Sequence, residues 1–155
     1  MSISSRRIFV AAAMFGLLSA NAWAQEFGTR DEAKAMVDAA VEHVKKVGSD
    51  QAFKDFTNKE NKAWQKKDLY VFAYTSEGVN VAHGANDKLV GKNLIELKDP
   101  NGKPLIQELR DTAKKGGGWV EYDWPHPQTK KIESKVSYTR MMTNFDGFVG
   151  VGVYR

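Results

Sequence analysis

The spacing of apolar residues changes at Asp68, and this change constrains the fold more than any other feature of the sequence. Before Asp68, apolar side chains recur at the three- and four-residue spacing of a helix. After it, short segments rich in β-branched and aromatic residues are separated by glycine, proline and polar turns, which is typical of strands. A chain with its helices first and its strands afterwards is predicted to be an α+β domain.

Two helices are expected between residues 26 and 67. Thr29, with Glu32 three positions later, has the pattern of a capping box at the start of the first helix. Gly48 is expected to end that helix, because glycine is common just after helix C-termini. A second helix should follow, with an apolar face formed by Ala52, Phe53 and Phe56.

Five strands are expected after the helices, at residues 69–75, 79–83, 119–124, 135–142 and 148–154. The first two are close enough along the chain to form a hairpin. Between the second and third strands, Pro104 can begin a short helix, because proline is favoured at the first helical position. This order predicts a PAS-like five-stranded antiparallel sheet with long N-terminal helices and a short helix between strands 2 and 3.

Residues 1–24 have the three parts of a secretory signal peptide. Arg6 and Arg7 precede a short apolar run, and Ala22-Trp23-Ala24 provides a small-residue cleavage site. The apolar run is shorter than the roughly 20 residues that span a bilayer, although an uncleaved anchor stays an alternative. We expect cleavage after Ala24, one domain over residues 25–155, a periplasmic location and no permanent membrane anchor.

The composition argues against several functional classes. The chain has no cysteine, so cysteine nucleophiles, thiolate metal sites and c-type haem attachment are excluded. Its 23 basic and 19 acidic residues are interspersed rather than gathered in a basic stripe, so no nucleic-acid partner is expected. The three histidines lack metal-ligand spacing, and no phosphate loop or nucleophile elbow is present. We therefore expect no catalytic residues, no metal and no cofactor.

Several segments, taken in order, resemble one known family. They are DLYVFAYTSEGVNVAHG (68–84), LVGKNLIELKDPNGKPL (89–105), GGGWVEYDWPHP (116–127), KVSYTR (135–140) and GFVGVGVYR (147–155). Together they resemble the single Cache domain of the second subtype, over roughly residues 26–155. The family's domains are extracytoplasmic sensors of small molecules, usually flanked by a transmembrane helix and a signalling domain.

The resemblance implies a ligand-binding domain, but this sequence ends at Arg155, directly after the last predicted strand. The expectation is therefore a soluble periplasmic module without its own output domain. It should bind a small organic ligand, expected to be a carboxylate, and pass the signal to a membrane-bound receptor or kinase partner.

The expected ligand contacts combine flat rings with polar tips and a few polar groups, as small-molecule sites do. They are Tyr74, His83, Tyr122, Trp124, Lys135 and Tyr138. Lys135 matches the K-x-S-Y strand of the family, and its ammonium suits a carboxylate. Strict alternation, however, puts Lys135 and Tyr138 on opposite faces, so either a bulge intervenes or only one of them lines the pocket. The rings are equally compatible with simple core filling.

Two other functions stay open at this point. The chain could be a structural or interaction subunit of a periplasmic or membrane complex, with no small-molecule ligand. A cavity below ~300 Å³ lined only by apolar groups would favour that hypothesis. An enzyme would need a nucleophile or base held by a partner. A strongly shifted pKa of His83 beside a carboxylate would indicate one.

Overall fold

The computed structural model describes residues 26–155. The predicted signal peptide and its cleavage site at Ala24 lie outside the described residues and stay predictions. Within residues 26–155, no helix is both long enough and apolar enough to cross a bilayer.

The chain begins with two helices that pack together, α1 (Arg30–Val47) and α2 (Ser49–Thr57). The predicted capping box is confirmed: Glu32 N–H donates to the Thr29 hydroxyl, and Thr29 N–H donates to the Glu32 carboxylate. Gly48 ends α1 with a φ of 86°, a conformation that favours glycine. The next residue, Ser49, starts α2. The apolar faces of both helices pack into one core against the sheet.

A five-stranded antiparallel sheet forms the centre, in the order β4-β3-β7-β6-β5. Its strands are β3 (Phe72–Thr75), β4 (Asn80–His83), β5 (Gly118–Pro125), β6 (Ile132–Met141) and β7 (Gly147–Tyr154). Between β4 and β5 come the single 3-10 turn η1 (Asp87–Leu89) and helix α3 (Leu105–Lys114). The predicted α+β, PAS-like plan is confirmed.

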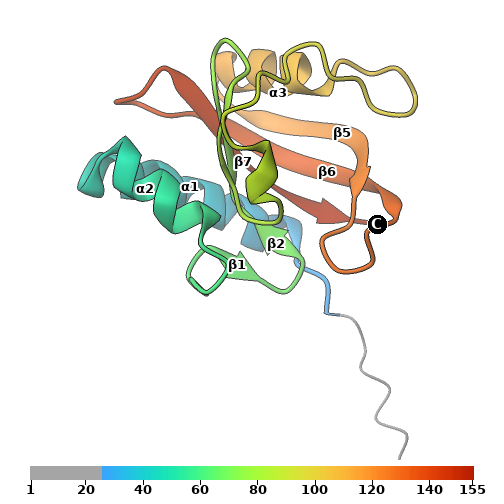
Figure 1. The fold of residues 1–155 in the computed structure, drawn as a ribbon, viewed down its shortest axis with the longest axis horizontal. Helices are drawn as coiled ribbons and strands as arrows, with labels where there is room; N and C mark the ends of the chain where they lie inside the picture. Colours follow the sequence, from blue (N-terminus) through green and yellow to red (C-terminus); the bar gives the residue numbers. More distant parts are fainter. Residues whose placement is uncertain (1–25) are drawn as a thin grey trace, which may run out of the picture.

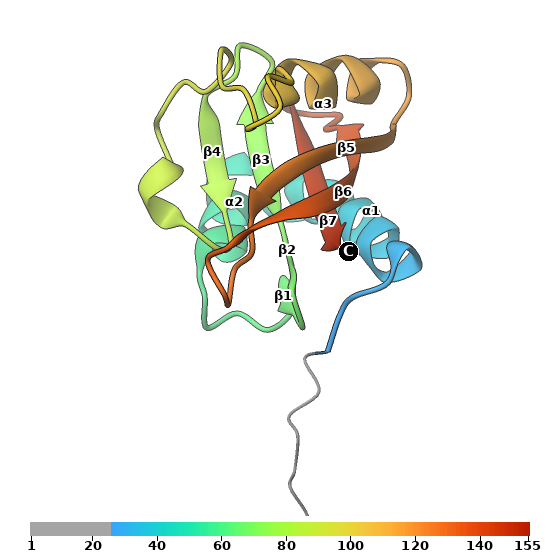
Figure 2. The same ribbon diagram turned by 90° about the vertical axis from the view of Figure 1, so that its right-hand side faces the viewer.

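Helices cover the two faces of the sheet separately (Figures 1 and 2). Helices α1 and α2 lie on one face, against a core of valine, alanine and phenylalanine side chains. Helix α3 lies on the other face, where Leu105, Ile106 and Leu109 pack against tyrosines and phenylalanines. We call these the α1 face and the α3 face.

The first predicted strand, residues 69–75, is in fact divided at Val71. Its first part, β2 (Leu69–Tyr70), pairs with β1 (Gln65–Lys66) in a separate two-stranded sheet, and only β3 joins the main sheet. The Val71 carbonyl accepts a hydrogen bond from Gly84 N–H, 2.9 Å away, at the division. The interruption leaves Tyr70 buried on the α3 face, next to that strand junction.

Candidate functional site

Alternation along β6 brings the predicted polar residues to the α3 face. The register is regular: Lys135 lies between Tyr122 on β5 and Tyr154 on β7. Val136 therefore faces α1, and Ser137 faces α3, because successive side chains point to opposite faces. No bulge interrupts β6, which answers the question that the sequence left open.

Five of the six predicted contacts lie together around one small cavity under α3. These are Tyr74, His83, Tyr122, Trp124 and Lys135, and the cavity is completed by Phe72, Leu105, Ile106 and Leu109. Its volume is about 10 Å³, close to the room that one water molecule needs. The cavity is thus well below ~300 Å³, but its walls are not only apolar, so the criterion for a purely structural protein is met only in part.

Lys135 is the cation at this site and is only 1% exposed. Its Nζ donates a hydrogen bond to the Tyr70 hydroxyl at 2.8 Å. Three rings surround the ammonium, with Nζ 4.1 Å from the centroid of Tyr70, 5.0 Å from that of Tyr154 and 5.4 Å from that of Phe72. Among residues 26–155 no carboxylate forms an ion pair with Lys135.

Burial lowers the pKa of Lys135 to about 7, because the ammonium loses its hydration in this apolar surround. The negative charge of buried Asp68 acts in the opposite direction and favours the ammonium. Asp68 is held by Gly28 N–H, which donates to Oδ1 at 2.6 Å, while Oδ2 has no hydrogen-bond partner. With a pKa of about 7 this amine is only partly protonated near neutral pH, and an anion placed beside it would favour the ammonium form.

Two glycines of β7 make the position of Lys135 possible. A Cβ atom on Gly152 would overlap Lys135 Cε and Ser137 Oγ, so the lysine stem crosses β7 where a side chain is absent. A Cβ atom on Gly150 would overlap the Phe72 ring in the same way. Both glycines stand in the segment 147–155 that carries the family resemblance, and glycine inside a strand is a signal of the close approach of a neighbouring chain segment.

The tautomer of His83 is fixed by the backbone of the loop that follows β4. Its Nδ1 accepts from the backbone N–H groups of Ala85 and Asn86, at 3.3 and 3.0 Å. The neutral ring therefore carries its proton on Nε2. Burial, and secondarily the charge of Lys135, lowers the pKa of His83 to about 3, so the imidazole is neutral at physiological pH. The shift is not caused by a neighbouring carboxylate, which was the condition for an acid–base pair.

The tyrosines supply neutral hydroxyl groups. Burial raises the pKa values of Tyr70, Tyr74, Tyr122 and Tyr154, so all four phenols stay protonated. Tyr122 is paired with Ser137, with 2.9 Å between the two hydroxyl oxygens. Tyr70, which was not among the predicted contacts, is the direct partner of Lys135. The alternation of Tyr70, Phe72 and Tyr74 within residues 69–75, which predicts one shared face, was the signal that could have identified it.

A hydrogen-bonded chain leads from the cation to a surface loop. Beyond Lys135, the Tyr70 hydroxyl lies 3.2 Å from the Tyr154 hydroxyl. Tyr154 in turn donates to the Pro125 carbonyl at 2.8 Å, where β5 passes into the loop before β6. The buried ammonium is therefore connected through two side chains to the 126–131 loop.

Tyr138 is not brought to this site. It lies on the α1 face, where its ring contacts Trp119 at 5.3 Å between centroids and Lys34 Nζ at 5.3 Å. The regular alternation of β6 is the physical reason, since Tyr138 and Lys135 are three residues apart. Arg140, two residues further along β6, faces α1 as well and pairs with Asp38 at 2.9 Å.

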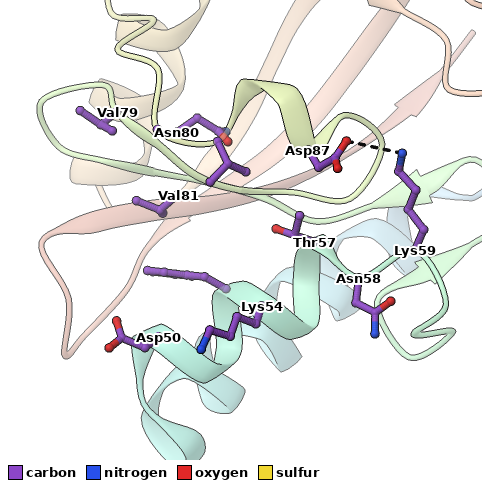
Figure 3. Close-up of a pocket in the computed structure, with 12 residues that line it drawn as sticks. Asp50, Lys54, Thr57, Asn58, Lys59, Val79, Asn80, Val81 and Asp87 are labelled. Atoms are coloured by element: carbon purple, nitrogen blue, oxygen red, sulfur yellow. Dashed lines mark ion pairs between the residues drawn. The ribbon is translucent and has the colours of Figure 1, made fainter.

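A larger hollow than this cavity lies elsewhere, between α2 and β4 (Figure 3). It is an open groove of about 780 Å³ whose lining includes Phe53, Val79 and Val81 and an exposed Lys59–Asp87 ion pair. It contains no buried charged group, and none of the predicted contacts lines it. Within residues 26–155, no cluster of side chains has the composition of a metal site. The α3-face cavity is therefore the candidate site.

The sequence model of the single Cache domain 2 family matches residues 15–155. The chain belongs to this family, whose domains are extracytoplasmic sensors of small molecules. The resemblance noted from the sequence is thereby confirmed.

Solved structures of similar fold include chemosensory domains. A methyl-accepting chemotaxis protein from Vibrio parahaemolyticus is 32% identical, with a TM-score of 0.68 over 80% of this chain and 86% of that one. A Cache chemosensory domain whose structure is described as a basis for carboxylic acid recognition is 25% identical, with a TM-score of 0.67 over 80% of this chain and 91% of its own.

Curated relatives are longer receptors and kinases. The sensor histidine kinase MctS of Rhizobium johnstonii is 40% identical over 88 residues, which are 57% of this chain and 19% of the kinase. The methyl-accepting chemotaxis protein CtpM of Pseudomonas aeruginosa is 32% identical over 88 residues, which are 56% of this chain and 16% of that receptor. The match therefore spans less than a fifth of each relative. The similarity is to sensor domains rather than to enzymes.

Proposed function

We propose that this protein is a periplasmic sensing module that binds a short-chain organic carboxylate at the α3 face. The observation that carries the proposal is the buried Lys135 ammonium, which has no carboxylate partner among residues 26–155. A ligand carboxylate would provide the missing countercharge through charge-assisted hydrogen bonds. The similarity to a domain described for carboxylic acid recognition supports this ligand class.

The residues around Lys135 narrow the ligand further. The site offers one cation, Lys135, beside neutral groups such as the His83 imidazole, and a single cation suits a single carboxylate rather than two. The opposite wall is made by Leu105, Ile106 and Leu109, which suit a short aliphatic tail. A cavity of about 10 Å³ does not hold such a molecule, so binding must displace lining side chains.

Signalling is proposed to depend on a partner. The domains to which this chain is similar occur in chemoreceptors and in a sensor histidine kinase. We propose that the module, exported by residues 1–24 and cleaved after Ala24, presents its ligand-bound form to a membrane receptor or kinase. N-terminal sequencing of the exported protein tests this location, and a start at Met1 would contradict cleavage.

Ligand binding is tested by thermal unfolding and calorimetry with propionate as the probe. Propionate should raise the midpoint of unfolding in proportion to its occupancy, following RT ln(1 + [L]/Kd). Propionamide, which has the same shape but no charge, is the matched control and should have no effect. If propionate, its shorter and longer homologues and hydroxylated acids all leave the midpoint unchanged, the carboxylate proposal is wrong.

The variant Lys135→Met separates the charge from the packing of this side chain. Propionate affinity should fall by more than about 100-fold, because the partner of the carboxylate is gone. The free energy of unfolding without ligand should stay the same or rise by about 1–3 kcal/mol, since a buried charge is replaced by an apolar group. Wild-type affinity in a folded Lys135→Met protein would refute the assigned role of Lys135.

A further inference from the structure

A second, polar cleft adjoins the buried cavity on the outside. It has a volume of about 340 Å³ and lies between the 83–88 segment and the 124–130 segment. His83 and Trp124 line both spaces, so this pair forms the wall between the cleft and the cavity. Their ring centroids are 6.2 Å apart.

The charge of the cleft is unbalanced. Three lysines line it, Lys59, Lys88 and Lys130, against a single carboxylate, Asp87. Asp87 compensates only Lys59, at 3.7 Å and with both side chains more than half exposed, so this pair is weak. A concave surface with one sign of charge concentrates ions of the other sign and speeds their association.

The two residues of the wall differ in their freedom to move. His83 is tied by two backbone N–H groups to the 85–86 segment. Trp124 is only partly buried, at the end of β5, its ring contacts those of His83 and Tyr122, and a single side-chain hydrogen bond joins it to the Tyr70 hydroxyl. Displacing Trp124 would join the cleft to the cavity without breaking the hydrogen bonds of His83.

We propose that this lysine-lined cleft is the access route for the anionic ligand, and that Trp124 is the gate between the cleft and Lys135. This inference rests on the proposed carboxylate function and adds a path and a means of selecting anions. The lysines act on the rate of capture, because charges at a rim change association and its salt dependence more than dissociation. Lys135 determines the affinity at the end of the path.

The first experiment needs no physiological ligand. Iodide, an anionic quencher, is compared with neutral acrylamide, and the fluorescence of Trp124 is isolated by subtracting that of a matched Trp124→Phe protein. Replacing Lys59, Lys88 and Lys130 together by glutamine should lower iodide quenching of Trp124 at least about twofold at low salt and leave acrylamide quenching unchanged. A control with Lys45, Lys114 and Lys115 replaced by glutamine has the same net charge and should quench like the wild type.

The second experiment measures propionate capture by stopped-flow fluorescence. The cleft variant should associate about threefold to tenfold more slowly at low salt, with an unchanged dissociation rate, and the difference should vanish at high salt. An equal effect in the control variant, or iodide quenching that does not depend on the cleft lysines, would overturn the route while leaving propionate binding intact. A third outcome is that propionate does not bind at all, while iodide quenching still depends on the cleft lysines. That result would overturn both the carboxylate function and the role of the cleft as its access route. The cleft would then be an anion-attracting surface only.

Discussion

The two faces of the sheet are built from the same strands but have opposite chemistry. On the α1 face, β7 contributes Val149, Val151 and Val153 to a core of aliphatic and aromatic side chains. On the α3 face, the intervening positions of the same strand are Gly150, Gly152 and Tyr154, and the lysine of β6 lies across them. One face is closed by side chains that fit each other, and the other keeps a buried lysine that forms no ion pair with a carboxylate among residues 26–155.

Under the proposed function, the difference means that stability and recognition are assigned to alternate residues of one strand. The α1 face gains free energy from apolar area removed from water. The α3 face loses part of that gain, because Lys135 and His83 are buried where their charged forms are disfavoured. A change on one face should therefore be measurable independently of the other.

Among single substitutions that test the difference between the two faces, Gly152→Ala on the α3 face should change propionate affinity and stability the most. The new methyl group would overlap the Lys135 stem and Ser137 Oγ, so we expect propionate affinity to fall about tenfold or more and stability to fall by about 1–3 kcal/mol. Combining it with Ser137→Ala removes one overlap and should restore stability more than affinity. Unchanged propionate affinity in Gly152→Ala, measured by calorimetry, would show that the path of Lys135 across β7 is unimportant.

On the other face, Val151→Ala should reverse this pattern. Val151 is fully buried, and losing two methyl groups in a packed core should lower the free energy of unfolding by about 2 kcal/mol. Chemical denaturation measures that loss, and calorimetry should find propionate affinity within about twofold of the wild type. A parallel loss of affinity would mean that the two faces are energetically coupled.

Changing the pH should move the two properties in opposite directions. The pKa of Lys135 is about 7 when folded and has an ordinary value of 10.5, so between these values the unfolded chain binds more protons and stability from this group rises with pH. Carboxylate affinity needs the ammonium and should fall by up to about tenfold per pH unit above 7. In Lys135→Met, the rise of the free energy of unfolding with pH between 7 and 10.5 should disappear, which chemical denaturation at several pH values would measure. In the wild type, a propionate affinity that stays constant from pH 7 to pH 9 would count against a titrating lysine.

The smallest effect is expected from Tyr138→Phe. Its ring stays in contact with Trp119 on the α1 face, and its hydroxyl makes no hydrogen bond among residues 26–155. Stability should change by less than about 0.5 kcal/mol, as for most substitutions that disturb no packing, and propionate affinity should not change. A clear loss of affinity would place Tyr138 back among the ligand contacts.

The sequence predicted the fold closely because its signals are local. Periodicity located the helices and strands, and the capping box of Thr29 and Glu32 located the start of α1. The division of the first strand at Val71 was missed, because the pairing of Leu69–Tyr70 with Gln65–Lys66 is set by the course of the chain and not by the β-forming character of its residues.

The site was predicted in part for the same reason. Tyr74, Tyr122 and Lys135 follow from alternation, which also excludes Tyr138 once β6 is known to be regular. The partnership of Lys135 with Tyr70 joins residues far apart in sequence, at a bend that no local pattern reports. The room that Gly152 leaves for the Lys135 side chain likewise depends on how β6 and β7 pair, which no single strand reveals.

The chain of hydrogen bonds from Lys135 to Pro125 has only one possible polarity. An ammonium can only donate and a carbonyl can only accept. The Tyr70 hydroxyl must therefore donate its hydrogen bond to Tyr154, and the Tyr154 hydroxyl must donate its own to the Pro125 carbonyl. Neither tyrosine then has a proton left to offer a ligand, and both present only lone pairs to an incoming acid. Because linked hydrogen bonds polarise one another, an acid that draws the Lys135 protons to itself weakens the far bond at Pro125. Under the proposed function, occupancy of the interior would therefore be felt at a backbone carbonyl beside a surface loop.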